Sequence, residues 1–151
     1  MFLRKLLLSL LVLVFLIPFS FVEAAKLTPD SSIKVYLDGK PLTFDVDPIQ
    51  TNGTTLVQFT TIFKALGVSY EWNKHLQTII GKKQDLELYL QLNNRIATVN
   101  SVNIRLQTAP IAYENRTLVP LRFISEATGM NVTWNAATKR IDIASVAKPV
   151  L

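Results

Sequence analysis

Two stretches of this chain, 62 residues apart, carry nearly the same sequence, and this duplication limits the folds open to it. Residues 33–80 align with residues 95–142 without a gap. The matching positions include a turn proline, a strand, a helix-ending glycine and a tryptophan: Pro48 and Pro110, Thr55–Val57 and Thr117–Val119, Gly67 and Gly129, Trp72 and Trp134. Such a period is typical of a duplicated supersecondary unit. Because a 60-residue unit buries too little surface to be stable alone, the two copies should form one domain.

The first 24 residues have the pattern of a secretory signal peptide. A short basic start, Arg4-Lys5, precedes an apolar run over 6–21, and Val22 and Ala24 place small residues before a cleavage site at Ala25. The run of about 16 residues is shorter than the roughly 20 that a membrane-spanning helix needs. The sequence therefore predicts a signal peptide at 1–24 and one secreted, extracellular domain at 25–151 that folds without disulfides, since the chain has no cysteine.

Local patterns predict the same order of elements in each copy. Ile33, Val35 and Leu37 alternate with polar residues before an Asp38-Gly39 turn, which predicts a hairpin. Apolar residues then follow a helical period over 59–66, and Gly67 is placed to end that helix. A strand follows over 68–72, and strict alternation predicts another at 85–92.

These elements predict an α+β fold of two tandem hairpin–helix–strand repeats, with an antiparallel sheet wrapped around short helices. Pro120 is expected at the first position of the second helix, where a missing N–H costs nothing. Trp72 and Trp134 occupy equivalent strand ends. We expect them to be paired plugs of the core, the alternative being an exposed aromatic platform for sugars or peptides.

The sequence offers no set of residues for catalysis, a cofactor or a metal. Transition-metal sites need several His, Cys or carboxylate ligands, yet the chain has one histidine, His75, and no cysteine. The same histidine has no nucleophile beside it in the sequence pattern, and the five glycines stand singly, so no phosphate-binding loop is indicated. We therefore predict a protein that is not an enzyme, with no catalytic, cofactor-binding or metal-binding residues.

The second copy carries a family resemblance. The segment Asn115 to Ala127, followed by Gly129 and Trp134, resembles the signature of the copper amine oxidase N-terminal "stalk" domain family, and Asp38–Leu42 resembles the same family's first half. The likeness covers about 33–143. It implies an antiparallel sheet curled around helix, in exported proteins of Gram-positive bacteria. It does not imply oxidase activity, because copper and the quinone cofactor belong to a separate catalytic domain in that family.

Two non-enzymatic functions follow from these patterns. The first is a secreted protein-binding module that inhibits extracellular serine proteases, a hypothesis to which a looser resemblance to small secreted bacterial serine protease inhibitors also contributes. Its candidate contact stretch is 107–116, with Pro110 as stiffener and Tyr113 or Arg116 as specificity residues. Arg122 could bind an acidic partner or brace Glu126 one turn along its helix.

The alternative is a cell-envelope accessory domain, or stalk, that docks on wall polymer without inhibitory activity. After removal of 1–24, the chain would keep 14 Lys and Arg against 10 Asp and Glu, and this net charge of +4 would attract such a protein weakly to an anionic wall. Neither hypothesis involves a nucleic acid, or a membrane once the signal peptide is removed.

Overall fold

The computed structural model describes residues 26–146, so the expected signal peptide and its cleavage site at Ala25 lie outside the described range. The described residues form thirteen strands and two helices: β1 Lys34–Leu37, β2 Lys40–Leu42, β3 Ile49–Thr51, β4 Thr54–Gln58, α1 Phe59–Ala65, β5 Ser69–Asn73, β6 Thr78–Lys83, β7 Leu86–Gln91, β8 Ile96–Val99, β9 Val102–Arg105, β10 Ile111–Tyr113, β11 Arg116–Pro120, α2 Leu121–Ala127, β12 Met130–Asn135 and β13 Arg140–Ser145.

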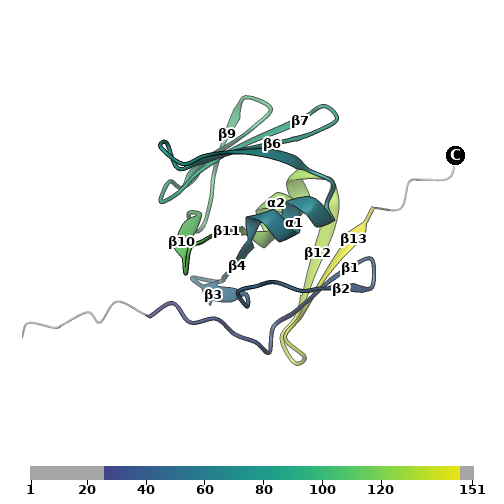
Figure 1. Cartoon of the computed structure of the whole chain (residues 1–151). Coiled ribbons are helices and arrows are strands. Elements are labelled where there is room, and N and C mark those ends of the chain that lie inside the picture. The colour runs from purple at the N-terminus through teal and green to yellow at the C-terminus, as the bar shows by residue number, and fades with distance from the viewer. Residues whose placement is uncertain (1–25, 147–151) are drawn as a thin grey trace, which may run out of the picture.

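The strands assemble into three sheets. One has the order β10-β11-β4-β3, a second the order β12-β13-β1-β2, and a five-stranded sheet the order β5-β6-β7-β8-β9. Figure 1 shows the two helices side by side near the centre of the molecule, with the five-stranded sheet on one side of them and the other strands below and beside them. The sheets supply most of the backbone hydrogen bonding, and the helices fill the space between them.

The elements of the two halves correspond at the 62-residue spacing of the sequence match. Strand β4 corresponds to β11, and α1 corresponds to α2. Strands β4 and β11 pair antiparallel, with Val57 opposite Val119, two residues that occupy the same place in the two halves. An approximate two-fold axis therefore passes through this pair. Superposition of 33–80 on 95–142 as complete units stays a prediction.

Each half completes its sheet with strands from the other. The first hairpin, β1–β2, joins β13 of the second half, and the β8–β9 hairpin joins β6 of the first half through β7. The first and last strands of the chain meet because β1 runs parallel to β13, with Val35 beside Ile141. Neither half can form its sheets without the other.

The expected α+β class with one antiparallel sheet wrapped around helices is wrong. Strands make up 50% of the structure and helix only 12%, and the strands belong to three sheets, one of which contains the parallel β1–β13 pair. The reason is that each helix has only seven residues, about two turns, which is too short to organise a single sheet around it. The fold is sheet-rich, and its helices are two short connections.

The core lies between the helices and the inner faces of the sheets. Ile62 and Phe63 of α1 and Ile124 of α2 are fully buried there.

Both helices begin without a side-chain cap, so packing rather than capping holds them. Pro120 is the last residue of β11 and precedes α2, which begins one residue later than expected. Gly67 has a φ of +69°, the left-handed conformation expected of a glycine just past a helix end.

Two carboxylates, Asp30 and Asp38, join the segment around β1 to β13, and a third, Asp142, forms an ion pair within β13. Asp30 accepts hydrogen bonds from both the backbone N–H and the hydroxyl of Ser32, and Lys139 Nζ lies 2.9 Å from its Oδ2. Asp38 accepts two hydrogen bonds from Ser145, each at 2.8 Å. Within β13 the Asp142 carboxylate forms an ion pair with the Arg140 guanidinium.

These contacts lower the carboxylate pKa values. Hydrogen bonds from the Ser32 side chain, and then from Lys139, lower the pKa of Asp30 from 3.8 to about 2. The Ser145 backbone N–H, followed by its hydroxyl, lowers the pKa of Asp38, and the Arg140 side chain lowers that of Asp142. In each case the hydrogen bonds favour the ionised form in the folded state.

We expect the free energy of unfolding to fall as the pH is lowered from 4 towards 2. A carboxylate whose pKa is depressed on folding stabilises the protein above the unfolded value, here 3.8, and that contribution is lost as the pH falls through the folded value, for Asp30 about 2. Urea unfolding at pH 7, 4, 3 and 2 measures this. Asp30→Asn should flatten the acid part of the profile. Asp85→Asn, at an exposed turn residue, is the control, and an unchanged profile in Asp30→Asn would contradict the assignment.

Candidate functional site

Two surface grooves occupy equivalent places in the two halves of the molecule. Each combines the start of the strand before one helix with the first turn of the other helix and the strand that follows it. The Trp134 groove is lined by Thr54 and Thr55 of β4, Leu121 and Arg122 of α2, and Val132 and Trp134 of β12. The Trp72 groove is lined by Arg116 and Thr117 of β11, Phe59 and Thr60 of α1, and Tyr70 and Trp72 of β5. Both grooves are therefore built from both halves.

The two tryptophans line these grooves, so the expectation that they plug the core is wrong. Trp72 is 38% exposed and Trp134 is 37% exposed. They lie on β5 and β12, which are edge strands of their sheets. The tryptophans lie opposite the buried Ile79 and Ile141 in their ladders, so both rings are on the inner face. Each of their strands has a neighbour on one side only, which leaves the ring partly open to solvent. The aromatic platform, the alternative interpretation, fits their exposure.

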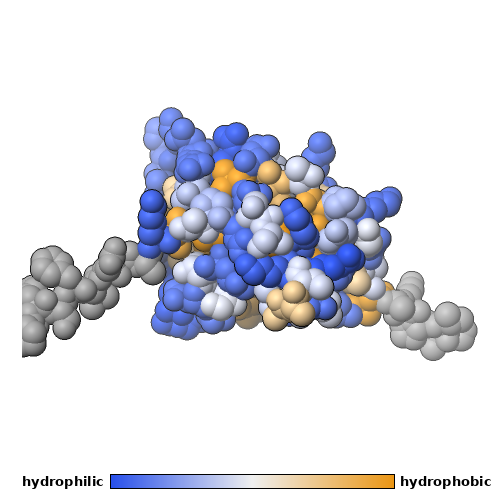
Figure 2. All heavy atoms as spheres, turned by 90° about the horizontal axis from the view of Figure 1, so that it is seen from below, coloured by the Kyte–Doolittle hydropathy of each residue, from blue (hydrophilic) through white to orange (hydrophobic). Residues whose placement is uncertain are grey.

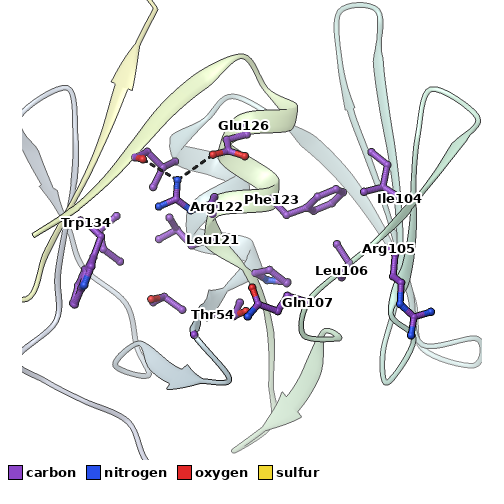
Figure 3. Close-up of a pocket in the computed structure, with 15 residues that line it drawn as sticks. Thr54, Ile104, Arg105, Leu106, Gln107, Leu121, Arg122, Phe123, Glu126 and Trp134 are labelled. Carbon is purple, nitrogen blue, oxygen red and sulfur yellow. Dashed lines mark hydrogen bonds and ion pairs between the residues drawn. The ribbon is translucent and has the colours of Figure 1, made fainter. Parts of the chain in front are cut away.

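The Trp134 groove contains an ion pair. Arg122 Nη1 lies 3.1 Å from Glu126 Oε1 and donates a 2.9 Å hydrogen bond to the Val132 carbonyl. Figure 3 shows this arginine extending from α2 towards the strand that carries Trp134, with its dashed contacts on both sides. The Arg122–Glu126 brace that the sequence spacing predicts is therefore present, and it engages the main cationic group in this groove.

Polar contacts between the two halves close one end of the Trp134 groove. Gln107 Nε2 donates a 2.6 Å hydrogen bond to the Asn52 carbonyl, and the Thr108 and Thr54 hydroxyls lie 3.0 Å apart. Figure 3 shows Phe123 pointing from α2 towards Ile104 of β9, and Arg105 directed away from the helix. The groove therefore offers the exposed Trp134 ring and the half-buried Phe123 ring beside an arginine that is already engaged in an ion pair.

The Trp72 groove is richer in aromatic side chains. The Phe59 ring lies 4.9 Å from the Tyr70 ring and 6.2 Å from the Trp72 ring, measured between centroids. It also packs edge-on against Phe63, at 5.6 Å. Tyr70 is 44% exposed, so two large rings on one edge strand face solvent over a buried aromatic base.

Two cations and several uncharged polar groups surround these rings. The cations are Lys74 and Arg116, and the latter lies 3.3 Å from the Asp45 carboxylate. Both members of that ion pair are largely exposed, so it holds the arginine only weakly. The neutral polar residues are Thr60, Gln77, Asn115 and Thr117. The groove can therefore offer ring stacking, hydrogen bonds and positive charge to one ligand.

The structure does not bring the four contact candidates together. Pro110 is buried, and its carbonyl accepts a 2.8 Å hydrogen bond from the Asn93 N–H. Tyr113 packs on a small apolar cluster, and burial, with the neighbouring Glu114, raises its pKa. Arg116 lines the Trp72 groove, whereas Arg122 lines the Trp134 groove.

Sequence reasoning missed two residues of the Trp72 groove, Tyr70 as an exposed ring and Lys74 as its neighbouring cation. A signal for both is present in the repeat itself. Tyr70 corresponds to Val132 and Lys74 to Ala136 at the 62-residue spacing. Scaffold positions are kept between the copies, so an aromatic and a charged residue found in only one copy mark a place where the copies differ in surface chemistry.

Across residues 26–146, no three His, Cys, Asp or Glu side chains are grouped so that they could hold a metal ion. His75 is exposed in the turn between β5 and β6. Within the same residues, neither helix has the length and apolar character needed to cross a membrane.

The sheets and the paired halves define a β-rich module with two equivalent surface grooves. The chain belongs to the copper amine oxidase N-terminal domain family, whose family model matches residues 36–143. This family is a non-catalytic accessory domain. The resemblance found in the sequence is thereby confirmed. Comparison with curated proteins gave no match.

Proposed function

We propose that this protein is a non-catalytic accessory module that acts outside the cell and attaches to the cell envelope. The observation that carries the proposal is the family match, which spans nearly all of the described residues and assigns them to an accessory domain. The two grooves supply surfaces through which such a module can attach. The signal-peptide pattern at 1–24 supports export.

The charge of the chain supports an envelope location. The net charge of the full chain is +5, of which residues 25–151 carry +4 (14 Lys and Arg against 10 Asp and Glu), and most of the charged groups are on the surface. Figure 2 shows one face of the molecule on which hydrophilic residues predominate, with smaller apolar areas between them. A positive surface attracts anionic polymers over about 8–10 Å at physiological salt, enough to raise the local concentration near a wall.

The structure gives the protease-inhibitor hypothesis no specific support. An inhibitory loop needs an accessible stretch that can enter a protease cleft, but the candidate stretch 107–116 is tied into the fold by hydrogen bonds at Gln107, Thr108 and Pro110. Its second part is the short β10–β11 hairpin, which pairs with β4. We therefore favour the accessory role over inhibition.

The proposal predicts where the protein is found and what it leaves unaffected. In a Gram-positive host that expresses the full chain, we expect the processed protein in the washed envelope fraction and its release by high salt. Titration against trypsin, chymotrypsin and subtilisin should leave their activities unchanged. Fractionation by immunoblot and chromogenic protease assays measure the two results. A protein confined to the cytoplasm, or stoichiometric loss of protease activity, would contradict the proposal.

A further inference from the structure

We propose that the Trp72 groove binds an acidic polysaccharide, with sugar rings stacked on Tyr70 and Trp72 and spaced sugar carboxylates held by Lys74 and Arg116. This inference rests on the proposed function, because it names the ligand through which the module would attach to the envelope. It also assigns different tasks to the two grooves: the Trp134 groove, although equivalent in position, has no counterpart of Tyr70, Lys74 or Arg116.

The stacking platform is formed by two rings on one face of an edge strand. Tyr70 and Trp72 are two residues apart in β5, so their side chains point to the same side, about 7 Å apart along the strand. A sugar ring presents C–H groups on its faces and hydroxyls at its rim, which matches an aromatic face beside polar groups. Tyrosine and tryptophan offer this combination of apolar area and a polar end.

The platform is held in place before any ligand arrives. Phe59, which is 7% exposed, contacts both exposed rings from below, and Phe63 packs against Phe59 and Tyr70. Rings fixed by such packing lose little conformational freedom on binding, and this strengthens affinity for a given contact area. An edge strand also leaves one side of the groove open, so a long chain can pass through.

The charges in this groove favour an anion with a few separated negative groups. The groove residues include Lys74 and Arg116 and no acidic side chain. Asp45 pairs with the arginine from outside the groove, and a ligand carboxylate can compete for the guanidinium because both partners are exposed to water. Hydrogen bonds to sugar hydroxyls are available from Thr60, Gln77 and Asn115.

Other polymers fit these observations less well. Single-stranded nucleic acid stacks on aromatic rings, but it carries one charge per nucleotide and relies on a continuous basic track, whereas this groove has two cations, one of them shared with Asp45. A peptide added to β5 would use the edge backbone of the strand and would not need the two rings on its face. A glycan with spaced carboxylates uses the rings, the neutral polar groups and both cations.

The equivalent positions of the Trp134 groove explain why the proposal is restricted to one groove. There Tyr70 is replaced by Val132, Lys74 by Ala136 and Arg116 by Thr54. Thr60 is replaced by Arg122, which is already engaged by Glu126 and the Val132 carbonyl. The second groove keeps the tryptophan but has no counterpart of the Tyr70 ring or of the Lys74 and Arg116 cations. Its other lining cation, Arg105, is directed away from α2 (Figure 3).

Binding of polygalacturonate fragments to the purified secreted protein tests the inference by isothermal titration calorimetry at low and high salt. We expect saturable binding that weakens with salt, and no binding of neutral dextran. Trp72→Ala and Tyr70→Val should each weaken binding about tenfold or more. Trp134→Ala is the matched control, with the same change at the equivalent position, and should leave binding within about twofold. Lys74→Ala should weaken binding and reduce its salt dependence.

Several results would overturn the inference. These are equal losses in Trp72→Ala and Trp134→Ala, or stronger Trp72-dependent binding of oligothymidylate or an extended peptide than of polygalacturonate. Circular dichroism and urea unfolding of each variant separate loss of binding from loss of fold, and Tyr70→Val places in β5 the residue that β12 carries at the equivalent position. If the protein is found in the envelope fraction but does not bind polygalacturonate, the proposed ligand is wrong and the accessory role is unaffected. If the protein inhibits a serine protease, the accessory role is wrong whatever the titration shows.

Discussion

Replacing Phe63 with alanine should lower the free energy of unfolding by about 3–5 kcal/mol. Phe63 is fully buried on α1, and its ring contacts those of Phe59 and Tyr70 at centroid distances of 5.6 and 6.1 Å. Removing the ring loses its transfer free energy and leaves a cavity that the surrounding sheet cannot close, because β6 and β7 are fixed by their ladder. Urea unfolding at pH 7, followed by tryptophan fluorescence, measures the loss.

Leu76→Ala is the control for this loss. Leu76 is a large apolar residue like Phe63 but is 61% exposed in the turn between β5 and β6, so its truncation should change the free energy of unfolding by no more than about 0.5 kcal/mol. A loss below about 1 kcal/mol in Phe63→Ala would show that the first helix does not pack as described. The same variant also tests the Trp72 groove, since Phe63 supports Tyr70 from below.

Local features of the fold could be predicted from the sequence because they depend on neighbouring residues. The Asp38-Gly39 turn joins β1 to β2, and both residues have positive φ, as the hairpin turn requires. Strict alternation over 85–92 predicts a strand, and β7 occupies Leu86–Gln91. Gly67 follows the end of α1 with positive φ, as predicted.

Long-range features could not be predicted from such patterns. The residues of β1 do not predict its pairing with β13. Alternation indicates which side chains of a strand face inward, but it does not indicate which strand lies alongside. The exchange of hairpins between the halves, and with it the three-sheet arrangement, depends on that pairing. The exposure of Trp72 has the same origin, since it depends on the strand being an edge.

Part of the candidate site could be predicted from the sequence. The brace between Arg122 and Glu126 follows from their spacing on a helix, and the ion pair is present at 3.1 Å. Placing Arg116 beside Trp72, by contrast, requires β4 and β11 to pair across the two-fold axis so that each half completes the other's groove. Residues 44 positions apart in the sequence meet there only because of the tertiary fold.

Gly81→Ala should also destabilise the protein, by about 1–3 kcal/mol, through overpacking. A Cβ at this position would lie 2.8 Å from Phe63 Cε2 and 3.1 Å from Val68 Cγ1, closer than real Cβ atoms pack. Gly81 lies in the middle of β6, paired with Tyr70 on one side and Leu88 on the other, so the backbone cannot move away without breaking ladder hydrogen bonds. The glycine is needed for space.

A double-mutant cycle distinguishes this steric cause from a general weakness of β6. Leucine at position 63 is shorter than phenylalanine and has no Cε2, so Gly81→Ala should cost less in the Phe63→Leu background than in the wild type, with a coupling free energy of about 1 kcal/mol or more. Urea unfolding of the four proteins measures the coupling. Additive losses, equal within about 0.5 kcal/mol, would show that the two residues are not in contact. Coupling of the expected sign would establish that β6 passes close to α1 at Phe63, the contact on which the aromatic base of the Trp72 groove depends.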